Sequence, residues 1–78
     1  SESLSRQRVL ADSMVIDYTT LFKGEQQKFE AGESSLFLVN SRESKLIEAT
    51  LKAIDTEVEQ KMALAEFYFN STFQSIKE

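Results

Sequence analysis

Apolar residues recur along the chain at spacings of three, four and seven, which is the period of an α-helix. One stripe occupies the first part of the chain: Ala11, Val15, Tyr18, Phe22 and Phe29, with Leu10, Met14 and Leu21 on the adjoining face. A longer stripe continues for nearly thirty residues in the second part: Ile47, Leu51, Ile54, Val58, Met62, Ala65, Phe69, Phe73 and Ile76. Its regular period predicts a coiled-coil seam.

Helix-breaking residues cluster at one place, residues 31–35, where the chain reads Ala-Gly-Glu-Ser-Ser. Gly32 suits the position that ends a helix in a left-handed conformation, and Ser34 is predicted to cap the helix that follows. We therefore predict helices over residues 3–30 and 34–77, joined by a tip at 31–33.

The predicted fold is a single all-α unit over residues 1–78, a long antiparallel coiled-coil-like hairpin with arms of unequal length. At 1.5 Å per residue, the second arm is ~65 Å long and the first ~42 Å. Gly24 lies inside the first arm, where it marks either a local weakness or a place of close packing.

The longer arm is predicted to run past the start of the shorter one, from about residue 63 onward. Four aromatic residues fall in this overhang: Phe67, Tyr68, Phe69 and Phe73. Exposed aromatic side chains, together with apolar stripes wider than one seam, predict self-association into a helical bundle. We expect the isolated chain to form a dimer packed through these aromatics.

Composition agrees with a helical fold and limits the chemistry, because the 78 residues include no Pro, no Cys and no His. Disulfides and thiolate or imidazole metal sites are therefore excluded. The thirteen carboxylates stand at charge-pair spacing rather than in a catalytic cluster, so we predict no enzymatic activity, no metal and no cofactor. A net charge of −4 argues against nucleic-acid binding. No apolar run approaches the ~18 residues of a membrane span, so no membrane contact by this segment is expected.

The order of residues around the corner is informative as well. From Phe29 the chain reads Phe-Glu-Ala-Gly-Glu-Ser-Ser-Leu, and further on it reads Leu-Ile-Glu-Ala from Leu46 to Ala49. This order resembles the C-terminal repeat of the TolC-like outer-membrane efflux proteins. That family shows an aromatic residue, x-Ala-Gly, two variable residues, Ser-Leu, and then a Leu-x-Glu-Ala stretch. The match from Phe29 to Ala49 contains no gap.

The resemblance implies that the chain is a fragment of a larger channel protein, a periplasmic segment in a Gram-negative-type envelope. In that family three protomers form a periplasmic helical barrel joined to an outer-membrane β-barrel, in the export of small molecules. The Gly corner is the tip of a helical hairpin and docks a periplasmic adaptor (membrane fusion) protein. The adaptor-contacting tip would then be formed by Ala31, Gly32, Glu33, Ser34 and Ser35.

Three residues depart from the family pattern, and one of them is Asn40, where family members commonly have Leu. Family members often carry acidic pore-facing residues after the tip, where this chain has Leu38 and Ser41. As possible pore-facing residues they would form a weakly polar constriction rather than an acidic ring. The alternative interpretation of the chain is a free-standing small helical dimerisation or protein-interaction module, which the aromatic overhang favours.

Overall fold

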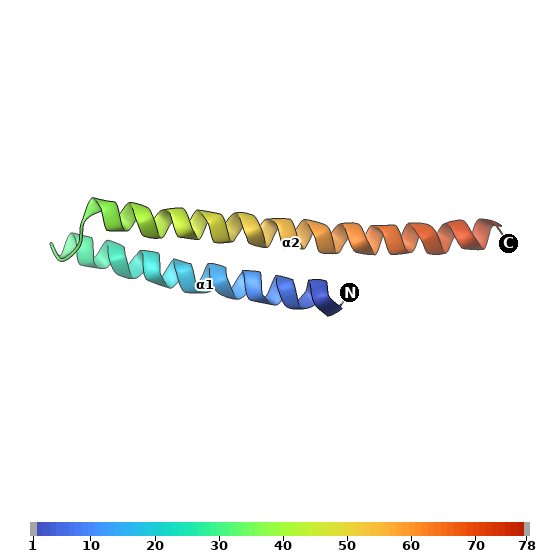
Figure 1. Ribbon diagram of the computed structural model, residues 1–78, viewed down its shortest axis with the longest axis horizontal. Helices are drawn as coiled ribbons and strands as arrows, with labels where there is room; N and C mark the ends of the chain where they lie inside the picture. The colour runs from blue at the N-terminus through green and yellow to red at the C-terminus, as the bar shows by residue number, and fades with distance from the viewer. Residues whose placement is uncertain (1, 78) are drawn as a thin grey trace.

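The computed structural model describes residues 2–77 as two α-helices joined by a short corner (Figure 1). Helix α1 spans Glu2–Glu30 and α2 spans Leu36–Lys77, so α2 begins two residues after the predicted start. The helices lie side by side and antiparallel in a rod of 70 × 17 × 13 Å. The prediction of an all-α hairpin with unequal arms is confirmed, because α2 continues far beyond the first turn of α1.

The seam between the helices has strict heptad spacing. In α2, buried and half-buried residues alternate at intervals of three and four: Val39, Arg42, Leu46, Ala49, Ala53, Thr56, Gln60 and Ala63. The α1 side is formed by Leu4, Arg8, Ala11, Val15, Tyr18, Phe22 and Glu25. Heptad positions of this kind keep one face of each helix against its partner along the whole contact.

Small side chains dominate the most buried part of the seam. Ala11, Ala49 and Thr56 are 5%, 6% and 1% exposed. The Thr56 hydroxyl donates a hydrogen bond to the carbonyl oxygen of Ala53 at 2.9 Å, so its burial leaves no unmade bond. Small residues on one helix leave room for the larger Tyr18 on the other, which borders the same hollow as Ala49.

The stripe predicted as the α2 seam does not face α1, and this part of the prediction is wrong. Its large members, from Ile47 to Ile76, are all about half exposed or more. At about 100° per residue, Ile47, Leu51 and Ile54 lie roughly half a turn from the seam residues Ala49 and Ala53. The α1 stripe was predicted correctly from Ala11 to Phe22, whereas Phe29 is 44% exposed.

Polar pairs hold the two helices in the same register at both ends of the seam. Near the open end, Arg8 Nη1 donates to Gln60 Oε1 at 2.9 Å, and Gln60 Nε2 donates to Ser5 Oγ at 3.4 Å. Near the corner, Arg42 Nε lies 3.3 Å from Glu25 Oε1. Such pairs specify one alignment, since sliding either helix would leave these groups without partners.

The two glycines differ in backbone conformation, although both have open space around them. Gly24 lies within α1 with ordinary helical geometry, and no atom lies within 4 Å of the place where a Cβ would stand. Of the two readings of Gly24, local weakness is therefore correct and close packing is not. Gly32 also has open space around it, but its φ of 76° is one that other residues rarely adopt.

Alanine at the two glycines should therefore change stability in opposite directions. We expect Gly24→Ala to raise the free energy of unfolding by about 1 kcal/mol, because alanine is the better helix former. Gly32→Ala should lower it by about 1 to 2 kcal/mol, since alanine is strained in the left-handed region. Urea denaturation followed by circular dichroism at one protein concentration measures both. Equal effects of the two variants would contradict this assignment.

Candidate functional site

The corner reverses the chain through two hydrogen bonds at the end of α1. The amide of Gly32 donates to the carbonyl of Phe29 at 3.0 Å. The amide of Glu33 donates to the carbonyl of Lys28 at 2.7 Å. This pair is the Schellman motif, which requires a left-handed residue at the position of Gly32. The prediction that Gly32 ends the first helix in this conformation is confirmed.

Helix α2 is capped by Ser35, and the prediction that Ser34 provides the cap is wrong. The amide of Leu38 donates to Ser35 Oγ at 3.2 Å, the bond expected of a serine immediately before a helix. The Ser34 hydroxyl instead turns toward α1 and donates to Glu25 Oε2 at 2.5 Å. The two adjacent serines thus form different contacts: Ser35 caps α2, and Ser34 connects the corner to α1.

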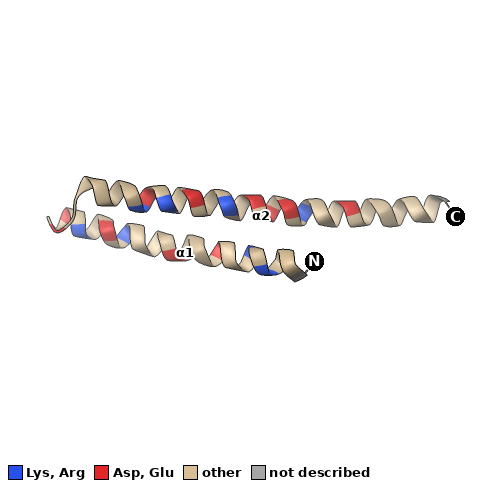
Figure 2. Cartoon of the chain, viewed as in Figure 1, with Lys and Arg blue, Asp and Glu red and all other residues tan. Residues whose placement is uncertain are grey.

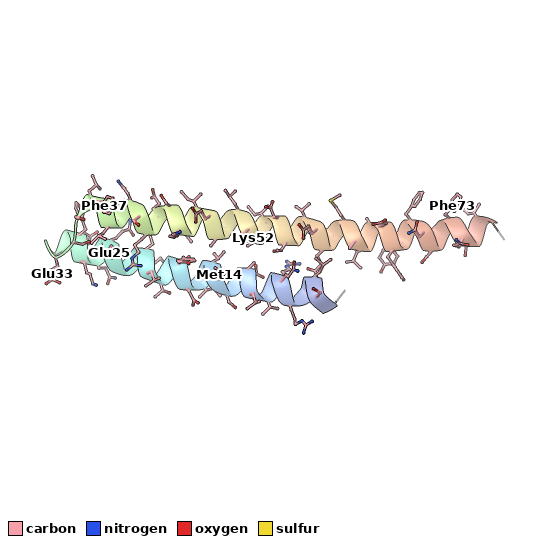
Figure 3. All side chains as sticks on the ribbon, viewed as in Figure 1. Met14, Glu25, Glu33, Phe37, Lys52 and Phe73 are labelled. Carbon is pink, nitrogen blue, oxygen red and sulfur yellow. The ribbon has the colours of Figure 1, made fainter. Side chains whose placement is uncertain are left out.

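Glu25 is the centre of the polar contacts behind the corner. Its side chain is 7% exposed and lies between the helices (Figure 3). One oxygen accepts from Ser34 and the other from Arg42, so both carboxylate oxygens have partners from beyond α1. The Ser34 bond is the largest influence on the Glu25 pKa and lowers it. Loss of solvent acts in the opposite direction, while Arg42 and the Lys28 charge lower the pKa further, for a net decrease.

The lowered pKa predicts that the contribution of Glu25 to stability disappears in acid. The fold favours the ionised carboxyl, so the contribution is complete above the usual glutamate range and is lost as the pH falls through the lowered value. We expect Glu25→Gln to destabilise the hairpin at pH 7 and to differ little from the original chain near pH 2. Urea denaturation at the two pH values measures this. The control Glu59→Gln, at an exposed carboxyl, should stay within about 0.5 kcal/mol of the original at both.

The residues predicted to contact an adaptor lie together at one end of the rod. Ala31, Gly32, Glu33 and Ser35 are exposed, and Ser34 is half-buried because it contacts Glu25. Glu33 lies at the extreme end of the molecule (Figure 3). The corner therefore presents a narrow surface with an acidic side chain and an open glycine backbone.

Leu38 and Ser41, the possible pore-facing residues, are both exposed and follow one another along one line of α2. The spacing of three and four continues to Lys45 and, seven residues later, to Lys52. Lys52 and Met14 of α1, both labelled in Figure 3, line a shallow hollow of about 150 Å³ on this side of the hairpin. Leu38 and Ser41 thus belong to the charged flank of the hairpin, distinct from both the seam and the apolar stripe.

The four aromatic residues assigned to oligomer packing lie toward the far end of α2. The overhang begins later than predicted, because Ala63 is half-buried in the seam and Phe67 still borders α1, in a hollow with Ser5. Phe67, Tyr68, Phe69 and Phe73 are between 52% and 68% exposed. Phe67 and Tyr68 meet edge to face with ring centroids 5.8 Å apart, and Phe69 stacks on Phe73 at 6.2 Å. No charged residue falls between Glu66 and Lys77, and this stretch of α2 is uniformly tan in Figure 2. The overhang is therefore an uncharged aromatic surface.

Sequence reasoning missed the polar contacts of Glu25 and Arg42 because charged residues were assigned to solvated faces. A signal was available in the heptad spacing. Glu25 follows Phe22 by three, and Arg42 precedes Leu46 by four, so each continues a seam. Opposite charges at facing seam positions predict a pair between the helices.

Residues 2–77 contain no group of three or more acidic side chains placed to hold a metal ion. Neither helix, over the part that the structure describes, is long and apolar enough to cross a membrane.

No protein-family model matches the chain, and neither a curated protein nor a solved structure is similar to it at a significant level.

Proposed function

We propose that this chain is a periplasmic α-helical hairpin of an outer-membrane efflux channel of the TolC-like family. In this role the hairpin is a structural, non-enzymatic element of the duct wall through which small molecules are exported. Its corner docks a periplasmic adaptor protein. Further copies of the channel protein complete the duct, which contains three protomers in total in the family that the chain resembles.

The observation that carries this proposal is that α2 has two interaction faces on opposite sides. One is the seam with α1. The other is the exposed apolar stripe from Ile47 to Ile76, whose first members, Ile47 and Leu51, border a hollow with Phe22 of α1 while the rest of the stripe continues along the outside of α2. A helix in a compact bundle concentrates its apolar residues toward one common core. A helix in the wall of a helical barrel has a neighbour on each side and needs two such faces. The arrangement therefore supports a wall more than the bundle expected from the sequence.

The corner supports the proposal independently. The ungapped resemblance from Phe29 to Ala49 spans the end of α1, the turn at Gly32 and the first turns of α2. The exposed line that begins at Leu38 and Ser41 and continues through Lys45 is polar after its first residue. A charged flank beside the seam suits the water-filled side of a duct.

The second candidate is a free-standing helical interaction module, and the exposed aromatic overhang favours it. A module of this kind would bind a partner helix along Phe67 to Phe73 and would have no use for the corner. The length of the reading frame separates the two candidates. A frame of several hundred codons agrees with a channel, whereas a frame limited to these residues agrees with the module.

Docking at the corner can be tested by crosslinking, because the chain has no cysteine of its own. The full-length channel protein carrying Glu33→Cys is labelled with benzophenone maleimide in the periplasm of its host and irradiated. We expect a covalent product with the periplasmic adaptor, detected by antibody and by mass spectrometry.

Ser71→Cys is the matched control, since it is an exposed serine in the overhang, about 50 Å from the corner along α2. It should give crosslinks to neighbouring channel helices and none to the adaptor. If both variants reach the outer membrane and Glu33→Cys yields no adaptor product, docking at the corner is wrong.

A further inference from the structure

The last turns of α2 carry an apolar face that lies outside the seam. Its large members recur at intervals of seven, four and three, and so lie on one side of the helix: Met62, Phe69, Phe73 and Ile76. They are 66%, 68%, 52% and 78% exposed, and the rings of Phe69 and Phe73 stack with centroids 6.2 Å apart. We call these four residues the distal apolar face.

The opposite side of the same turns is polar but uncharged. It consists of four exposed residues with amide or hydroxyl side chains: Asn70, Ser71, Gln74 and Ser75. No charged residue falls between Glu66 and Lys77, so this part of α2 is tan in Figure 2, whereas red and blue alternate earlier in the helix. A helix with one bulky apolar face and one polar face is the form that lies in the plane of a lipid surface.

The other two aromatic residues of the overhang border this face without belonging to it. Phe67 lies toward α1, in a hollow that it shares with Ser5. Tyr68 meets Phe67 edge to face and lies about 110° around the helix from the middle of the distal apolar face. Tyr68 is therefore close to the boundary between the apolar and polar sides. Tyrosine is enriched at such boundaries in membranes, because its ring is apolar and its hydroxyl is polar.

The absence of charge decides which occupant fits the distal apolar face best. Farther back on α2 the apolar stripe has charged neighbours, since Glu57 and Lys61 form an ion pair at 3.0 Å next to Val58. Charged side chains beside an apolar seam set the choice and orientation of a partner helix. Residues 67–76 include no such side chain. A lipid surface needs no complementary charge, because burial of apolar area alone can provide the binding free energy.

We infer that the distal apolar face binds a lipid surface, with this part of α2 lying in the plane of the interface. Phe69 and Phe73 then lie among the acyl chains, while Asn70 and Gln74 face the headgroups and water. The contact needs no membrane-spanning segment. Because residues 67–76 carry no charge, binding depends on apolar area and on gaps in lipid packing, which are larger on curved surfaces, and hardly on anionic lipid.

This inference goes beyond the proposed function and does not depend on docking at the corner. In water, a second copy of the chain covers the same aromatic side chains. Self-association and lipid binding therefore compete for the distal apolar face, and adding lipid should shift the chain from its associated form to the vesicles.

Flotation with vesicles tests the inference on the 78-residue chain. The purified chain is mixed with small, highly curved vesicles of dioleoylphosphatidylcholine and with large vesicles of the same lipid. Both kinds are also prepared with added dioleoylphosphatidylglycerol, which is anionic. At equal lipid concentration we expect the small vesicles to carry more of the chain than the large ones. The anionic lipid should change the bound fraction by less than about twofold.

Two double variants locate the contact. Phe69→Ser with Phe73→Ser should lower the partition coefficient about a hundredfold, because two rings are lost from the acyl region. Phe29→Ser with Phe37→Ser is the matched control, since it removes two rings that are 44% and 78% exposed at the corner end. Figure 3 shows Phe37 and Phe73 at opposite ends of α2. The control should stay within a few-fold of the original chain, and circular dichroism verifies the helical content of both variants.

The inference is overturned if the original chain does not float with small neutral vesicles, or floats only when the anionic lipid is present. It is also overturned if the two double variants lose the same affinity, since the effect is then not local to the distal apolar face. A chain that sediments as a dimer and does not float identifies a second copy as the occupant instead. Each of these outcomes leaves docking at the corner, and hence the proposed function, unaffected.

Discussion

Replacing Ala49 by phenylalanine is expected to lower the free energy of unfolding by about 3 kcal/mol, the largest single-residue effect that we foresee in this hairpin. Ala49 is 6% exposed, and Tyr18 already borders the same hollow from α1. A second aromatic ring at this place either pushes the helices apart or must turn into the shallow hollow beside Tyr18, and either arrangement disturbs the packing of the small residues of the seam.

Urea denaturation at a fixed protein concentration measures this effect, because self-association would otherwise change the apparent stability. Gln26→Phe is the control, since it places the same ring at an exposed position of α1 outside the seam and the apolar stripe. It should change stability by no more than about 0.5 kcal/mol. A loss of similar size in both variants would indicate that helix propensity, rather than packing in the seam, is responsible.

The second large effect is expected on association. We predict that the original chain sediments with at least twice its monomer mass of 8.9 kDa, because association removes the exposed aromatic side chains of the overhang from water. The double variant with Phe69→Glu and Phe73→Glu loses the stacked pair of rings and places two negative charges in the contact. Burial of each ring contributes about 1.5 to 3 kcal/mol, so the dissociation constant should rise more than a hundredfold.

Analytical ultracentrifugation over a range of concentrations measures this change. Ser13→Glu with Gln27→Glu is the control, because it adds the same charge at exposed polar positions of α1. It should leave the association constant within a few-fold of the original. A folded original chain that stays monomeric at millimolar concentration would contradict the prediction.

The sequence was sufficient to predict the helices because their signals are local. Periodicity, the absence of proline and the single corner at Gly32 determine two arms of unequal length. The end of α1 was predicted correctly, since a glycine in the left-handed region has a distinctive place at a helix terminus. The start of α2 was two residues off because Ser34 and Ser35 are equally good caps locally, and only the contact of Ser34 with Glu25 separates them.

The predicted seam of α2 was wrong because the hydrophobicity of a helix face does not determine which neighbouring helix packs against it. Ile47 and Ile54 give the stronger pattern, yet α1 packs against Ala49 and Ala53. The aromatic residues of α1, such as Tyr18, need small residues opposite them, and this is a property of both helices together. The candidate site was therefore predictable in position, at the corner, but the Glu25 contacts behind it depend on the register.

The polar pairs at the two ends of the seam have a mechanical consequence. A slide of one heptad would bring Glu25 opposite Ala49, where no donor exists, and would also separate Arg8 from Gln60. The helices consequently resist shear along their common axis, and the hairpin behaves as a strut of fixed length. We expect a push at Glu33 to be transmitted along α2 as a rigid displacement over the part that these pairs brace, as far as Gln60, about 40 Å away.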